Sequence, residues 1–423
     1  MANTYLTISM VTREALMVLK NETVFTTEIN RDYDDQFGIT GAKIGAVVNV
    51  RKPARFIGTT GPALGVEDFN ETYVPVVLTT QFHVDTQFTE QDLLLSVDEF
   101  SDRIIQPGIA TIANRVDRDM LVMAKNATYN IVGVPGTPAT GLLTYLNAGA
   151  LITAEAAPRD GRRSMTVEPF TGAAIVDALK GLFIPQGTID QQFKKGLMGR
   201  DSGGMNWRED QNVVNQTFGF GASTTTAVTL SYNSVAAAGS ISTGWASSTT
   251  LTLTNSAALT LNQGDTFTIA NIFPVNPQNR QAYGSNRLRS FVVNSTVSAA
   301  AAGTITVNVS PALIIGGQFQ NCAIGATSTT AVVTPLSLAL GAASAVVSPQ
   351  NILCHRSAFT LAMADLPIPR GVAFSGRAAD KKAGMSVRIV RQYTINNDSE
   401  PCRIDVLYGG APLYPELSCR VPA

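Results

Sequence analysis

Charge is almost absent from one long internal stretch of this chain. Between residues 223 and 345 the only acidic or basic residues are Asp265, Arg280, Arg287 and Arg289, whereas the whole chain carries 31 basic and 32 acidic residues. The rest of the stretch is mainly Ser, Thr, Ala, Gly, Asn and β-branched residues. Because the composition changes sharply at both ends, we predict a domain inserted into another domain, whose two flanking segments form one split body.

Strand patterns fill this insert. Polar and apolar residues alternate in TTLTLTN, DTFTIANI, SFVVNSTV and GTITVNVS, and turn-forming residues separate these runs. Such short, evenly spaced runs are typical of a small barrel or sandwich. The sequence therefore predicts a six-stranded antiparallel β-barrel over residues 223–345.

Bulk properties exclude several classes of protein. At 423 residues the chain is long enough for roughly two to four domains that need no disulfide or metal. Its four cysteines form no C-x-x-C pair, which favours reduced cysteines without a zinc site. No secretion signal and no apolar stretch of membrane-spanning length are present, so we predict no membrane partner. A net charge of −1 argues against tight nucleic-acid binding, but not against a protein that surrounds nucleic acid.

The N-terminal flank predicts a short helix and a projecting hairpin. Residues 9–22 place apolar side chains on one helical face. Two β-rich segments follow, one on each side of residues 58–70, which are rich in Gly and Pro. This composition favours a long loop over a tight two-residue turn.

A long helix is predicted after the hairpin. Ser96 and Glu99 form a capping box, and apolar residues then recur at helical spacing as far as Met123. Pro107 and Gly108 interrupt this pattern. A proline inside a helix removes a backbone hydrogen bond, so we predict a kink or a new helix start there. Pro107 and Gly108 are therefore candidate hinge residues.

One string resembles a catalytic motif. Asp201-Ser202-Gly203-Gly204 is similar to the sequence around a trypsin-like nucleophile. Such a serine needs a histidine base held by a carboxylate, yet the only histidines, His83 and His355, lie in unrelated segments. We therefore predict a glycine-rich loop, no enzyme activity, no metal site and no cofactor.

Two groups of charges are candidate contact residues. The hairpin carries a basic group and an acidic group, Arg51, Lys52, Arg55, Glu67, Asp68 and Glu71. A projecting arm has few partners in its own subunit, so these charges either face solvent or pair with a neighbouring copy. The three arginines of the insert are predicted at its surface, either as contacts to another subunit or as solubilising charge. Asp265, the acidic residue of the insert, is a further candidate for an inter-subunit contact.

Four separated segments carry a family resemblance. KIGAVVNVRKPARF, the run QFHVDTQFTEQDLLLSVDEFSDRIIQPGIATIANRVDRDML, and SAFTLAMADL followed by SVRIVRQYTINNDSEPCRIDVLYGG resemble the coat proteins of short-tailed, Salmonella-phage-type bacteriophages. LNQGDTFTIANIFPVNPQNRQ resembles the inserted domain special to that family. The segments occur in the family's order and span essentially the whole chain.

This resemblance implies an α+β fold, the Hong Kong-type capsid fold of tailed phages with an inserted six-stranded barrel. It also implies seven regions along the chain: an N-terminal arm (1–36), an extended loop with peripheral strands (37–88), a spine helix of the peripheral domain (89–127), the first segment of an axial domain (128–222), the insert (223–345), the second axial segment (346–395) and C-terminal peripheral strands (396–423).

The resemblance implies a structural function. The chain would self-assemble into hexamers and pentamers of an icosahedral shell around packaged double-stranded DNA, first in the bacterial host cytoplasm and finally as the virion capsid. Scaffolding and portal proteins are implied partners, with weak, nonspecific contact to DNA. Gly219 and Gly221 are implied hinge residues. The family's inter-capsomer contact uses a charged loop, but the segment before Asp265 is uncharged, so this contact would be lost or moved to residues 280–289.

Two alternatives stay open at this point. An encapsulin-like nanocompartment would share the fold and enclose an enzyme, and the DNA content of purified shells separates it from a phage coat. A β-rich tail or adhesin protein is suggested by the low-charge insert alone, and it predicts elongated trimers. An enzyme would rest on Ser202 alone.

Overall fold

The computed structural model describes residues 12, 15–19, 23–31, 47–68, 71–89, 106–138, 141–179, 203–221, 228–231, 245–255, 258–283, 287–300, 303–324, 330–335, 339–340, 346–380, 385–396 and 399–423. The chain divides into two units, each built from separate segments. Unit 1 consists of Met1–Val50, Tyr73–Leu121 and Phe359–Leu413, and unit 2 of Arg51–Thr72, Val122–Ala358 and Tyr414–Ala423.

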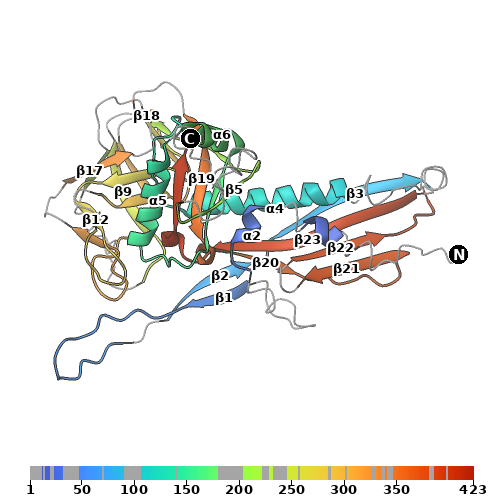
Figure 1. Cartoon of the computed structure of the whole chain (residues 1–423), viewed down its shortest axis with the longest axis horizontal. Coiled ribbons are helices and arrows are strands. Elements are labelled where there is room, and N and C mark those ends of the chain that lie inside the picture. The colour runs from blue at the N-terminus through green and yellow to red at the C-terminus, as the bar shows by residue number, and fades with distance from the viewer. Residues whose placement is uncertain are drawn as a thin grey trace. The chain divides into compact units, whose positions relative to one another are not determined.

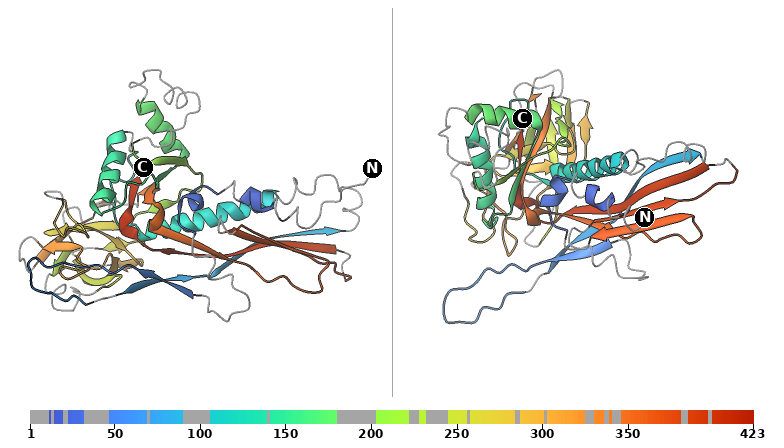
Figure 2. Two further views of the ribbon diagram at one scale, coloured as in Figure 1. Left: turned by 60° about the horizontal axis from the view of Figure 1, so that its bottom comes forward. Right: turned by 45° about the vertical axis from the view of Figure 1, so that its right-hand side comes forward.

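An antiparallel sheet forms the centre of unit 1. Its order is β20-β23-β22-β21, and β3 pairs with the long strand β23. Figures 1 and 2 show β21, β22 and β23 side by side. The strands are β3 (Thr80–Thr89), β20 (Phe359–Ala364), β21 (Phe374–Asp380), β22 (Met385–Arg391) and β23 (Ser399–Pro412). Segments about 300 residues apart in the sequence therefore share one sheet, since His83 pairs with Asp405.

Helix α4 (Gln106–Ala127) buries one apolar face, formed by Ile109, Ile112, Val116 and Met120. Pro107 lies in its first turn, where a missing N–H breaks no intrahelical hydrogen bond. The choice between a kink and a new helix start depends on residues 101–105, which lie outside the described residues. The predicted capping box, Ser96 with Glu99, lies outside the described residues.

Close packing explains the glycine that follows this proline. A Cβ atom on Gly108 would lie 3.4 Å from Ile404 and 3.7 Å from Val84, which belong to β23 and β3. Gly108 thus lets the start of α4 approach the sheet. It acts as a packing residue in this structure.

The N-terminal segment of unit 1 is held by one buried carboxylate. Residues 15–19 are helical, as predicted, and α2 (Phe25–Glu28) follows. Asp117, fully buried on α4, accepts hydrogen bonds from the backbone N–H groups of Val24 (2.6 Å) and Thr26 (3.0 Å). Asp117 therefore caps the N-terminus of α2, because Val24 at the cap position forms no side-chain hydrogen bond to the helix.

Unit 2 contains a second sheet, of order β24-β19-β4-β5, with β6 also paired to β19. Its strands are β4 (Arg163–Val167), β5 (Asn206–Glu209), β6 (Asn215–Thr217), β19 (Val347–His355) and β24 (Ser418–Pro422), and its helices are α5 (Leu142–Ala154) and α6 (Pro169–Leu179). The core includes Tyr145, Met165, Trp207 and Leu353. The rings of Tyr145 and Trp207 meet edge to face, with centroids 5.2 Å apart.

The predicted boundary at residue 396 is not where the structure divides. Strands β20 to β22, predicted as axial, pair with β23 in unit 1, whereas β24, predicted as peripheral, pairs with β19 in unit 2. Short 3-10 turns, η4 (Arg356–Ala358) and η5 (Pro415–Leu417), separate these strands. Pairing partners lie far apart in the chain, so local patterns do not reveal which sheet a strand joins.

The described portion of the insert forms eleven strands, and six of them close a barrel in the order β11-β13-β15-β9-β8-β17. The other five strands are short and lie outside the barrel, and they were not predicted from the sequence. The barrel strands are β8 (Val228–Ser231), β9 (Thr249–Asn255), β11 (Thr266–Ile269), β13 (Ser290–Val293), β15 (Gly303–Ser310) and β17 (Thr330–Pro335). The others are β10 (Leu259–Leu261), β12 (Ile272–Pro274), β14 (Val297–Ala299), β16 (Cys322–Ile324) and β18 (Ala339–Leu340).

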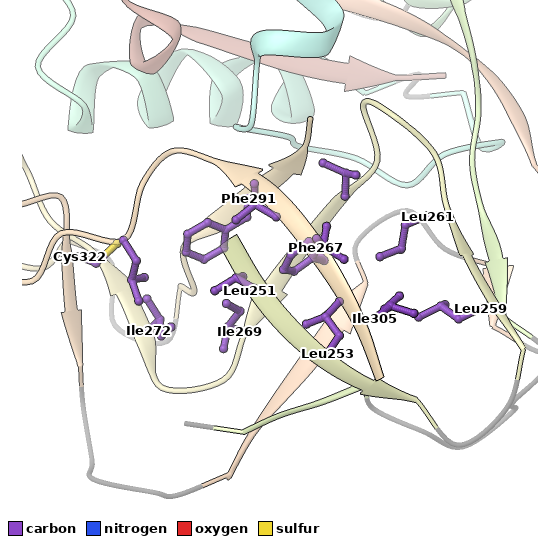
Figure 3. Packing of buried hydrophobic residues seen from close by; sticks show 14 residues of the cluster. Leu251, Leu253, Leu259, Leu261, Phe267, Ile269, Ile272, Phe291, Ile305 and Cys322 are labelled. Carbon is purple, nitrogen blue, oxygen red and sulfur yellow. The ribbon is translucent and has the colours of Figure 1, made fainter. Parts of the chain in front are cut away.

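A single apolar cluster fills this barrel, and it includes Phe267, Phe291 and the alternate residues of β9 and β15 (Figure 3). The two phenylalanine rings stack with centroids 6.0 Å apart. Every second residue of a strand faces the same side, so the alternation seen in the sequence supplies the core directly.

The two ends of the insert lie together. β6 pairs with the start of β19, so that Thr217 lies opposite Val347, and the N–H of Phe218 donates to the carbonyl of Val346 at 2.8 Å. β7 (Phe220–Gly221) then runs parallel to β18. The host sheet can therefore resume directly where the insert ends.

The hairpin consists of β1 (Val47–Lys52) and β2 (Thr72–Val77), which pair as a two-stranded ribbon. Residues 53–68 between them contain no strand, in agreement with the predicted loop; Figure 1 shows this segment in blue. We call residues 51–72 the arm and residues 56–68 its tip.

Candidate assembly arm and insert junction

Charges at the base of the arm have partners within the chain. Arg51 lies 3.5 Å from Glu71 across the hairpin, with side chains 80% and 45% exposed. Arg55 donates to Glu416 at 3.2 Å. Lys52 lies 4.8 Å above the ring of Tyr414, and burial is the main cause that lowers its pKa. The premise that the arm has few partners in its own subunit is therefore wrong, because residues 414–416 come back beside the base of the arm.

The tip is organised by Glu67. Its carboxylate accepts hydrogen bonds from the backbone N–H groups of Ile57 (2.7 Å) and Gly58 (2.5 Å), and the bond from Ile57 is the main cause that lowers the pKa of Glu67. Gly58 has φ of +75°, a backbone conformation that favours glycine. The Glu67 carboxylate thus closes the loop, because it joins the end of the tip to Ile57 and Gly58 near its start.

Large apolar side chains on the tip face outward. Phe56 is 60% exposed, Ile57 55%, Leu64 91% and Val66 84%. Scattered apolar side chains on a surface are ordinary, whereas several on one short loop indicate a contact surface.

A buried carboxylate joins the insert to β6, which pairs with β19 of the sheet in unit 2. Asp265, fully buried, accepts hydrogen bonds from the backbone N–H groups of Gly219 (2.9 Å) and Asn262 (2.7 Å) and from the Gln216 amide (3.0 Å). Lys125 of α4 donates to the same Gln216 at 2.5 Å. We call these residues the Asp265 cluster. Asp265, a predicted inter-subunit contact, is instead enclosed in its own chain.

Burial shifts the ionisation of this cluster. It raises the pKa of Asp265 to about 6, against hydrogen bonds that lower it, and it lowers the pKa of Lys125 to about 8. Arg420 of β24, also fully buried, has its pKa lowered to about 10, mainly by burial and against the charge of Asp265. Among the described residues its guanidinium has no hydrogen-bond partner.

An ion pair forms a second joint between insert and host. Arg289 is 2% exposed and is ion-paired with Glu155, which is 3% exposed and follows α5. The hydroxyl of Tyr283 also donates to Glu155, and Arg289 lies 4.8 Å above the ring of Tyr129. Burial raises the pKa of Glu155, while the charge of Glu155 keeps that of Arg289 high although burial alone would lower it. The prediction that Arg289 lies at the surface is wrong, because its partner comes from the host domain.

The two implied hinge glycines lie in the same region. A Cβ atom on Gly219 would lie 2.0 Å from the carbonyl oxygen of Thr260, so only glycine fits there. Gly221 pairs with Leu259 of β10 and with Leu340 of β18. Whether the insert rotates about them stays a prediction; in this structure Gly219 permits a close backbone contact.

Sequence reasoning missed Glu155, Lys125, Gln216 and Arg420. The signal that could have found two of them is an isolated charge in an apolar context, as in LITAEAAP around Glu155 and CRVP around Arg420. A charge within such a run is buried with a partner more often than it is exposed alone.

The residues with possible catalytic chemistry do not come together. Ser202 lies outside the described residues. His83 pairs with the neighbouring Asp85 at 2.8 Å on an exposed strand, and buried His355 pairs with Asp160 at 3.1 Å. The four cysteines are buried and form no disulfide.

Metal-binding clusters and membrane-spanning helices are both missing from the described ranges. Within those ranges no three His, Cys, Asp or Glu side chains are grouped as metal ligands. None of the described helices combines the length and apolar character needed to cross a membrane.

Comparison with known families decides the identity. A sequence model of the family described as "P22 coat protein - gene protein 5" matches residues 1–419. This chain belongs to the P22 coat protein family. It is a phage coat protein, a structural component of the virion capsid and not an enzyme, as the sequence predicts. This family assignment agrees with the tailed-phage capsid fold that the resemblance implied.

Solved structures with low similarity include a protein of Mycobacterium phage Che8 (10% identity, 94% of this chain and 90% of that chain covered, TM-score 0.47). The capsid of cyanophage P-SCSP1u follows with 8% identity, 94% and 87% coverage and a TM-score of 0.42. A virus-like particle from Pyrococcus furiosus has 8% identity, 98% coverage of both chains and a TM-score of 0.38. Among curated proteins no relative matches the chain.

Proposed function

We propose that this coat protein closes into hexamers and pentamers of an icosahedral shell that encloses packaged double-stranded DNA. One subunit type builds such a shell when head-to-tail contacts close into rings of five or six. Family membership supports self-assembly of a shell. The observation that carries the finer proposal is the arm tip, because its exposed apolar side chains need a covering partner and copies of the same chain are its neighbours in a shell.

Charges would fix the register between neighbouring subunits. Arg51 and Glu71 form an exposed pair, Asp68 is exposed, and Arg287 is partly exposed. An exposed pair contributes little within one subunit, but complementary charges across an interface orient the partners. These four residues are the remaining candidates for inter-subunit contacts.

The shell would contact its DNA weakly. A net charge of −1 gives no strongly basic lining that would hold DNA through release of counterions. We further propose a scaffolding protein and a portal protein as partners, and assembly in the host cytoplasm.

A paired substitution tests the role of the tip. We expect Leu64→Glu with Val66→Glu to abolish closed shells in negative-stain electron microscopy when the chain is co-expressed with a candidate scaffolding partner. Both side chains are exposed in the subunit, so its melting temperature should not change. Thr60→Glu, which adds a charge to the tip without removing an apolar group, should leave shells intact. Normal shells from the double variant would exclude the tip as an essential contact.

The alternatives predict different particles. Shells that are purified from infected cells and contain no DNA would favour a nanocompartment. Elongated trimers would favour a tail or adhesin protein. Family membership does not favour either.

A further inference from the structure

Two loops of the insert contact the arm tip of the same chain. Arg280 donates from its guanidinium to the backbone carbonyl of Phe56 at 2.7 Å, and the amide of Gln318 donates to the backbone carbonyl of Asp68 at 2.7 Å. The two contacts are made to the first and last residues of the tip. All four residues belong to unit 2.

The loop that carries Arg280 is held in place by Asn276. The side-chain oxygen of Asn276 accepts from the N–H groups of Gln278 (2.8 Å) and Asn279 (3.1 Å), and its amide donates to the carbonyl of Ala154 at 2.7 Å. The N–H of Arg280 closes the turn on the Asn276 carbonyl at 2.9 Å. The loop is therefore fixed to the C-terminal end of α5, and this restrains the backbone that carries the Arg280 side chain.

Arg280 occupies an unusual backbone conformation. Its φ is +56°, in the left-handed region where glycine and asparagine are the common residues. A long charged side chain at such a position brings no benefit to the turn itself. Strained backbone of this kind clusters at functional contacts, and here the guanidinium donates to the backbone of the tip.

Both loops also act on Glu67, the carboxylate that closes the tip. The charge of Arg280 and a hydrogen bond from Gln318 each contribute to the lowered pKa of Glu67. Glu67 in turn holds the N–H groups of Ile57 and Gly58. The insert thus acts on the backbone of the tip and on the Glu67 carboxylate. The large apolar side chains of the tip stay exposed.

We propose that Arg280 and Gln318 form a cradle on the insert that holds the arm tip of its own subunit before assembly. The cradle orders the tip in advance and presents its apolar side chains to a neighbouring copy, which reduces the conformational entropy lost on docking. The inference concerns the unassembled subunit, so it stands or falls independently of whether shells form.

Amide hydrogen exchange in the unassembled full-length subunit tests the cradle. The protons to follow are those of Ile57 and Gly58. Arg280→Asn removes the guanidinium and keeps a residue suited to positive φ, and Gln318→Ala removes the second contact. We expect exchange at both amides to accelerate at least about fivefold in the double variant, the factor that matches one hydrogen bond of about 1 kcal/mol, and by less in each single variant.

Two controls make the result specific. Arg162→Asn removes another exposed arginine of unit 2 and should leave both amides unchanged. Wild-type protection should also be independent of protein concentration, because the contact lies within one chain. Unchanged exchange in the double variant, equal acceleration in Arg162→Asn, or protection that falls on dilution would each overturn the proposal.

Discussion

Removal of Arg289 should break the joint between the insert and its host domain. Arg289 and Glu155 are 2% and 3% exposed, so Arg289→Met leaves a buried carboxylate whose one remaining hydrogen-bond partner among the described residues is the Tyr283 hydroxyl. Loss of one partner from a buried ion pair costs about 3–5 kcal/mol. With the Tyr283 hydrogen bond retained, we expect a loss of about 3 kcal/mol in the free energy of unfolding.

The assay is equilibrium urea unfolding of the unassembled subunit, followed by tryptophan fluorescence. With an m-value of about 2 kcal/mol per molar, the urea midpoint should fall by about 1.5 M. The double variant Arg289→Met, Glu155→Gln removes the stranded charge, so most of the lost stability should return. Because burial already raises the pKa of Glu155, the penalty in the single variant should shrink as the pH falls and the carboxylate takes up a proton.

An exposed pair provides the matched control. Arg162 is 64% exposed and lies 3.8 Å from Asp160, so Arg162→Met should cost less than about 0.5 kcal/mol. The reasoning is refuted if Arg289→Met shifts the midpoint no more than this control does. Simple additivity of the two substitutions at Arg289 and Glu155 would refute it equally, because it would show that the charges do not interact.

Three further predictions concern single buried sites. The folded-state pKa of Asp265 is about 6, above its ordinary 3.8, so the stability that this group contributes is greatest at low pH and is lost as the pH rises through 6. Between pH 5 and 7 the free energy of unfolding should fall by about 1 kcal/mol. The difference in urea midpoint between wild type and Asp265→Asn should therefore change with pH, and parallel pH profiles would count against this reasoning. Asp117→Ala should lower the free energy of unfolding by about 2–4 kcal/mol, because the buried N–H of Thr26 and the partly buried N–H of Val24 both lose their charged acceptor. Proteolysis within residues 15–31 should accelerate, and an unchanged cleavage rate would argue that α2 does not need this cap. Gly409→Ala would place a Cβ atom 1.9 Å from the carbonyl oxygen of Val77 and should lower the melting temperature strongly. Gly303→Ala is the control, because no atom lies within 4 Å of the added Cβ, and it should change the melting temperature little. Similar melting temperatures for the two variants would show that the backbone at Gly409 can move aside.

Local patterns were sufficient for much of the fold. Alternation in GTITVNVS gives β15, whose alternate residues are buried, and the turn-rich loop after β1 is where the sequence places it. Helical spacing of Ile109, Ile112 and Val116 gives the buried face of α4. These features follow from a period of 2 or 3.6 residues, which is a property of the local chain.

The candidate contact residues show the limit of that reasoning. Scarcity of charge in the insert predicted exposed arginines, yet Arg289 is buried because Glu155, 134 residues earlier, lies opposite it. Arg280, from the same loop-like stretch, is partly exposed and donates a hydrogen bond to Phe56, 224 residues earlier. Nothing in the sequence near either arginine distinguishes these outcomes.

The sequence by itself determined the composition break that marks the insert, the strands and helices with strong periodicity, and, through four family-like segments, the identity as a phage coat protein. The tertiary structure alone decided which sheet receives β20 and β24, which charges are buried, and that the insert touches the arm of its own chain. The physical reason is distance along the chain: periodicity and turn chemistry act over a few residues, whereas strand pairing, burial and ion pairing depend on segments hundreds of residues apart that only the fold brings together.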